Sequence, residues 1–71
     1  RQQISEEEWK KKLGDIHQQL DDFDVDSVLK SIQELRNCLL TDENRKLLRM
    51  CEKAVNDFAY DVAMEIVSSA L

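Results

Sequence analysis

The stretches LDDFDVDSVLKSI, at residues 20–32, and VNDFAYDVAMEIV, at residues 55–67, decide the fold. When Phe23 is placed over Phe58, a spacing of 35 residues, both read apolar–polar–Asp–Phe, with another Asp three residues later and an apolar stripe beyond it. Each stretch is typical of a tight corner where one helix ends and an aromatic residue fills the start of the next. Two such corners predict two helical hairpins.

The composition supports a small all-α protein, which we predict to be a four-helix up-down-up-down bundle built from two helical hairpins. Hydrophobic residues make up 42% and charged residues 35% of the 71 residues, as in globular proteins. The chain has no proline and one glycine, so turn-rich β folds are disfavoured. We interpret residues 1–71 as a single helical domain and, because the first residue is an arginine, as a fragment of a longer protein.

The clearest helix start lies at Ser5, which can cap a helix while Glu8 reaches back to form a capping box. The first helix is expected at residues 6–20. The second begins after an Asp24 cap, with Phe23 and Val28 at the spacing of a hydrophobic staple, and ends near Leu40.

The third helix is expected to begin after Thr41 and to end near Asp57. Ala59 is a poor cap for the fourth helix, so one continuous helix through Phe58 is the alternative. The fourth helix carries apolar residues on more than one side, which indicates that it is central or docks on a partner.

The apolar stripes of these helices predict the core. If Phe23 and Phe58 belong to it, truncating either to alanine costs about 3–5 kcal/mol. The expected core residues are Trp9, Leu13, Ile16, Leu20, Phe23, Val28, Ile32, Leu35, Leu47, Cys51, Ala54, Phe58, Met64 and Val67.

The net charge of −5 and the pI of about 4.7 disfavour nucleic acid and anionic lipid as partners. The basic run at residues 10–12 follows the acidic run at residues 6–8, which indicates a solvated face whose charges pair with each other. No apolar run reaches the roughly 20 residues needed to span a membrane.

The two cysteines, Cys38 and Cys51, favour a reducing compartment and therefore a cytoplasmic protein. Cys51 lies on the apolar stripe of the third helix and is expected in the core, whereas Cys38 lies off the stripe of the second. A bridge between them stays open at the level of sequence.

The single histidine, His17, lies at the margin of an apolar stripe and is interpreted as a partly covered boundary residue. No serine–histidine–acid set or metal-ligand spacing accompanies it. The acidic run at residues 21–26 lacks the glycine and distal glutamate of a calcium loop. We therefore predict no enzymatic activity, no metal, no cofactor and no small-molecule substrate.

Residues 20–71 resemble the C-terminal helical extension of bacterial hybrid sensor histidine kinases, which is similar to a histidine phosphotransfer bundle. FDVDSVLKSI at residues 23–32 and LLRMCEKAVNDFAYDVAMEIV at residues 47–67 carry the resemblance, through a helix that ends in an Asp-Phe corner. Phosphotransfer domains present their histidine as H-x-x-K-G, whereas His17 is followed by QQLD. The resemblance implies a phosphotransfer-like bundle in a two-component system, which binds partners without carrying phosphate.

The expected function is a non-catalytic protein–protein interaction module in a bacterial signal-transduction protein. The candidate contacts are Val62, Ile66 and Leu71, and the partner is a receiver domain or a second copy of the chain. The alternative is a phosphorelay carrier with His17 as the phosphoacceptor. It requires a cation beside the imidazole, and the lysines at residues 10–12 lie one to two helical turns before it.

Overall fold

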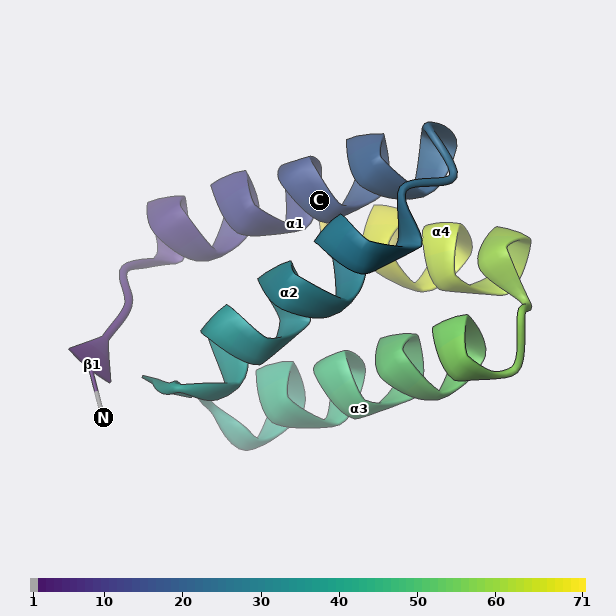
Figure 1. The fold of residues 1–71 in the computed structure, drawn as a ribbon. Coiled ribbons are helices and arrows are strands. Elements are labelled where there is room, and N and C mark those ends of the chain that lie inside the picture. Colours follow the sequence, from purple (N-terminus) through teal and green to yellow (C-terminus); the bar gives the residue numbers. More distant parts are fainter. Residues whose placement is uncertain (1) are drawn as a thin grey trace.

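The computed structural model describes residues 2–71 and confirms an all-α fold of four compactly packed helices, with one short pair of strands (Figure 1). In chain order the elements are β1 (Gln2–Gln3), α1 (Glu6–Asp21), α2 (Val25–Arg36), β2 (Cys38–Leu39), α3 (Asp42–Asn56) and α4 (Tyr60–Ser68).

Side chains cap the first three helices as their sequences predict. The Ser5 hydroxyl accepts from the Glu8 N–H at 3.1 Å, and the Glu8 carboxylate accepts from the Ser5 N–H at 3.3 Å, which completes the capping box. Asp24 accepts from the Ser27 N–H, and Thr41 accepts from the N–H three residues later. Each cap satisfies a backbone donor that has no partner within its helix.

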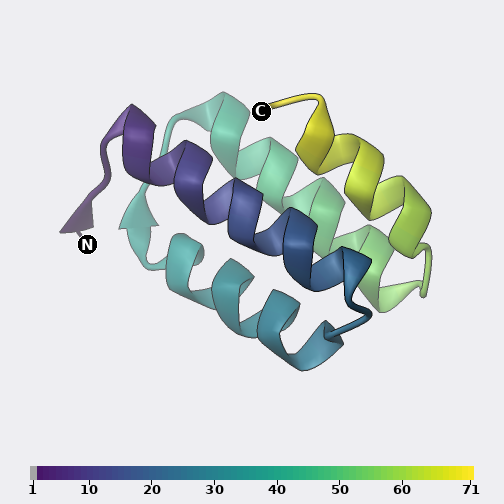
Figure 2. The same ribbon diagram turned by 90° about the horizontal axis from the view of Figure 1, so that it is seen from above.

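Consecutive helices pack against each other, and α4 also packs on α1 (Figures 1 and 2). The α1–α2 and α3–α4 corners lie at one end of the molecule, and the strand pair lies at the other. The core is apolar except for Ser31, whose hydroxyl donates to Gln19 at 3.0 Å. Its apolar members are Trp9, Leu13, Ile16, Leu20, Val28, Ile32, Leu35, Leu48, Cys51, Ala54, Val55, Ala63 and Val67.

The strand pair is the element that the sequence did not predict. Helix α2 ends at Arg36, four residues before the expected end near Leu40. The chain is extended at β2, which pairs in parallel with β1 in the register Gln2–Cys38 and Gln3–Leu39. The prediction for the end of α2 was therefore wrong, because a backbone partner from outside the helix takes these residues into a ladder.

The face of α3 that enters the core contains Cys51 and Ala54, as predicted, but differs from the prediction at the leucine pair. Leu48 is buried and Leu47 only half-buried, and Val55 is buried beside Cys51. Successive residues on a helix differ by 100°, so one position decides which of two adjacent leucines faces inward. On α4 the same correction puts Ala63 in the core and leaves Met64 at its edge.

The phenylalanines of the two corners are not in the core, which contradicts the prediction. Phe23 and Phe58 are 75% and 78% exposed, and both have left-handed backbone conformations, with φ of 56° and 62°. At the first corner the N–H of Phe23 donates to the Leu20 carbonyl at 3.0 Å, and the N–H of Asp24 donates to the Gln19 carbonyl at 2.9 Å.

The second corner repeats this pattern. The N–H of Phe58 donates to the Val55 carbonyl at 3.0 Å, and the N–H of Ala59 donates to the Ala54 carbonyl at 2.8 Å. These paired bonds form a Schellman motif, which ends a helix with a left-handed residue. The motif separates α3 from α4, so the alternative of one continuous helix was wrong. It also makes the staple between Phe23 and Val28 wrong, because the aromatic side chain is exposed.

Candidate functional site

A shallow groove lies between α3 and α4 and includes two of the three predicted contact residues. Val62 and Ile66 line it from α4, and Met50 lines it from α3. Its volume is about 290 Å³. Met50 and Val62 are each about half exposed, whereas Ile66 is half-buried against the core. The groove is therefore an apolar surface that a partner could cover.

The rim of this groove carries one ion pair. The Lys53 ammonium group lies 3.0 Å from an Asp57 carboxylate oxygen, one helical turn away. Both side chains are largely exposed, so the pair contributes at most about 1 kcal/mol to stability. Leu71, the third predicted contact, is exposed but does not line the groove.

A second apolar surface lies at the end where the two corners meet. The rings of Phe23 and Phe58 each lie 6.4 Å from the Tyr60 ring, measured between centroids, with interplanar angles of 76° and 90°. Edge-to-face packing at this separation is favourable for aromatic rings. Tyr60 is half-buried against the core and so fixes the position of the group. We call Phe23, Phe58 and Tyr60 the aromatic corner patch.

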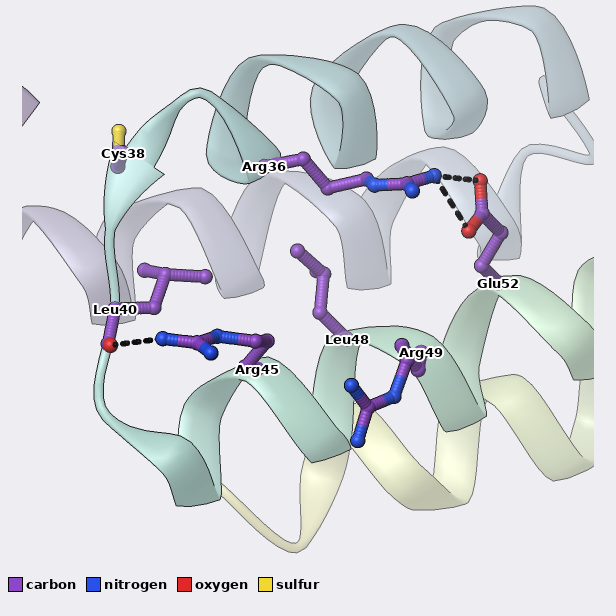
Figure 3. A pocket seen from close by; sticks show the side chains of 7 residues that line it. All are labelled: Arg36, Cys38, Leu40, Arg45, Leu48, Arg49 and Glu52. Atoms are coloured by element: carbon purple, nitrogen blue, oxygen red, sulfur yellow. Dashed lines mark hydrogen bonds and ion pairs between the residues drawn. The ribbon is translucent and has the colours of Figure 1, made fainter. Parts of the chain in front are cut away.

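A polar pocket of about 200 Å³ lies between the end of α2, β2 and α3 (Figure 3). The guanidinium group of Arg36 donates to both carboxylate oxygens of Glu52, at 2.9 and 3.1 Å. Arg45 donates to the Leu40 carbonyl at 3.3 Å, and Leu48 lies between these two arginines. The arginines thus connect helix α3 to α2 and to the segment that precedes α3.

A third hollow, of about 510 Å³, lies between the N-terminal strand and the end of α2. Lys12 on α1 pairs across it with Glu34 on α2 at 3.0 Å. The hydrogen bond from Lys12, followed by its positive charge, lowers the pKa of the Glu34 carboxyl. Because both side chains are substantially exposed, this pair contributes little to stability.

The predicted pairing of the lysine run with the glutamates at residues 6–8 is not what the structure shows. Lys11 lies 3.7 Å from Asp15, and Lys12 pairs with Glu34. His17, also on α1, is half-buried. Lys11 and Lys12 therefore pair with residues other than the glutamates at residues 6–8.

Both cysteines are free thiols, so the bridge left open by the sequence does not form. Cys51 is buried, as predicted, and burial, with a smaller contribution from the charge of Glu52, raises its pKa to about 11. The thiol is therefore protonated at neutral pH and unreactive. Cys38 is half-buried and donates weakly to the Glu34 carbonyl at 3.6 Å.

Across residues 2–71 no three histidine, cysteine or acidic side chains are arranged to hold a metal ion. None of the helices described combines the length and the apolar character that crossing a membrane requires.

Sequence reasoning found the Val62 and Ile66 surface from the excess of apolar residues on α4. It missed the aromatic corner patch, because it placed both phenylalanines in the core. The repeated Asp-Phe after each helix locates the two corners in the sequence, but it does not indicate that a Schellman motif holds each phenylalanine in an exposed left-handed position. Comparison of the chain with protein-family models, curated proteins and solved structures found no match.

Proposed function

We propose that the chain is a non-catalytic protein–protein interaction module of a bacterial signal-transduction protein. In this proposal the four helices form an up-down-up-down bundle of two hairpins, in one domain of a longer cytoplasmic protein. The observation that carries the proposal is the α3–α4 groove, where Met50 and Val62 expose apolar surface beside Ile66.

The proposed partner of the groove is a receiver domain of a two-component system. Support comes from the resemblance of residues 20–71 to the helical extension that follows a receiver domain in hybrid sensor kinases. The apolar floor of the groove supplies the contact area, and the ion pair of Lys53 with Asp57 forms a polar rim.

The test is a titration of the isotopically labelled chain with a purified receiver domain, followed by NMR. Binding should shift the resonances of Met50, Val62 and Ile66. Val62→Glu should weaken it about tenfold or more, because a buried charge would lack a partner. Leu39→Glu, an exposed change outside the groove, is the matched control.

Self-association is tested separately by sedimentation of the chain over a range of concentrations. Receiver binding that maps to the groove supports the proposal. A monomer whose groove resonances do not respond to receiver domains refutes it.

A further inference from the structure

Three features of the two corners are unfavourable for folding: left-handed phenylalanines, exposed aromatic rings and acidic residues at helix C-termini. Phe23 and Phe58 have φ of 56° and 62°, a region that strains residues with a β-carbon and normally takes glycine. Both rings are mostly exposed, so burial does not offset the strain. Strain at exposed aromatic residues, repeated in both hairpins, points to a function for the rings.

The third feature is the placement of acidic residues. Asp21 ends α1 and Asp22 caps it, at the negative end of the helix dipole, and the last turn of α1 carries no basic residue. Asp57 occupies the equivalent C-cap of α3. Acidic side chains are normally unfavourable at helix C-termini. The same end of the molecule thus holds both the strained rings and the misplaced carboxylates.

The charge around the patch has a single sign apart from one lysine. Residues 18–29 contain no lysine or arginine, and Lys53 is the last cation of the chain. Lys53 is already paired with Asp57 at 3.0 Å. The exposed acidic residues of the two corners are Asp21, Asp22, Asp24, Asp26, Asp57 and Asp61.

We propose that the aromatic corner patch binds a basic segment of a partner protein, in which arginine side chains accompany apolar ones. A guanidinium group can stack on an aromatic ring and pair with a neighbouring carboxylate at the same time. Apolar side chains of the same segment cover the remaining ring surface. The surrounding carboxylates supply the charge complementarity that selects a cationic partner.

The inference builds on the proposed function, since both assign the chain to protein binding, but it concerns a different surface and partner. The α3–α4 groove is lined by Met50, Val62 and Ile66, none of which belongs to the patch, although Asp57 lies at the edge of both surfaces. A negative binding result at one surface therefore leaves the proposal for the other surface open to its own test.

The experiment titrates the labelled 71-residue chain with a short synthetic peptide in which arginine alternates with leucine. A peptide with glutamate in place of arginine is the matched ligand control. The arginine peptide should shift the ring resonances of Phe23, Phe58 and Tyr60, and binding should weaken as salt is raised. The glutamate peptide should leave these resonances unchanged.

The decisive variant is the double substitution Phe23→Gly with Phe58→Gly. Glycine accepts the left-handed conformation without strain, so the variant should melt at an equal or higher temperature. Its affinity for the arginine peptide should fall about tenfold or more. Val62→Ala, in the groove, should bind as the native chain does.

Three results would overturn the inference. If the folded double variant bound the arginine peptide as tightly as the native chain, the peptide would be held by charge alone, without the aromatic rings. Equal binding of the glutamate peptide would show an apolar contact without charge selection. A dimer of the native chain that disappears in the double variant, with no peptide binding, would assign the patch to a second copy.

Discussion

Phe23 and Phe58 lie in the same backbone conformation on the two hairpins, and both pack edge-to-face with Tyr60. This relationship joins the end of α1 to the start of α4 through side chains at the surface. Each phenylalanine also occupies a left-handed backbone position, where glycine would have less conformational strain.

Replacing either phenylalanine with glycine should leave stability unchanged or raise the free energy of unfolding by up to about 1.5 kcal/mol. Relief of left-handed strain, about 1–2 kcal/mol, is partly offset by the greater freedom of glycine in the unfolded chain, about 0.5–1 kcal/mol. Urea denaturation measures the difference. Leu20→Ala, in the core beside the first corner, is the control and should lose about 2–5 kcal/mol. A loss of that size for Phe23→Gly or Phe58→Gly would mean that the rings are buried.

The orientation of α3 is tested by its adjacent leucines. Leu48→Ala should destabilise the chain by about 2–5 kcal/mol, because it empties space in the core. Leu47→Ala should cost less than about 2 kcal/mol, because Leu47 is only half-buried. Thermal or chemical denaturation of the two variants gives the comparison. The reverse order would contradict the described face of the helix.

The buried thiol of Cys51 should make stability depend on alkaline pH. Its pKa of about 11 in the folded chain lies above the ordinary value of 9.0. Between these values the folded state retains a proton that the unfolded state loses, so stability falls as pH rises through this window. The loss attributable to Cys51 should approach about 2–3 kcal/mol by pH 11.

The control for this pH dependence is Cys51→Ala, which lacks the titrating group but retains the other alkaline titrations. The difference between the two free energies of unfolding should stay constant below about pH 9 and change above it, because only the native chain has the thiol that ionises on unfolding. Curves that stay parallel up to pH 11 would show that the thiol is solvated in the folded chain.

His17 should not accept a phosphoryl group from a phosphorylated receiver domain. Lys11 and Lys12 are held in ion pairs with Asp15 and Glu34, and Lys10 lies seven residues, about 10 Å along the helix, before His17. None of the three is therefore placed to offset the charge of the transferred group. The measurement is a search for acid-labile, base-stable label on the native chain, with His17→Gln as the control. Label present on the native chain and lost in the variant would establish a phosphorelay carrier.

The fold was predictable where its signals are local. Ser5, Asp24 and Thr41 cap helices as their neighbours indicate, and the apolar stripe of α1 is the buried one. The conformation of Phe23 was not predictable in this way, because propensity argues against a left-handed phenylalanine. The parallel strands were missed because pairing of Gln2 with Cys38 depends on where the helices bring the chain.

The two candidate surfaces also differ in how far they could be predicted from local sequence. Val62 and Ile66 stand out in sequence, because α4 carries more apolar residues than one buried face needs. The aromatic corner patch depends on Phe23 and Tyr60 meeting across two hairpins, a tertiary contact without a local sequence signal.

The pairing of β1 with β2 has a consequence for how the chain folds. Gln2 meets Cys38 only by closing a loop that contains the whole first hairpin, and the ladder contains two residues on each side. The entropy of closing such a loop is recovered only after α1 and α2 have packed and brought their ends together. The strands therefore form late and open early, and amide exchange at Cys38 and Leu39 reports a local fluctuation instead of global unfolding.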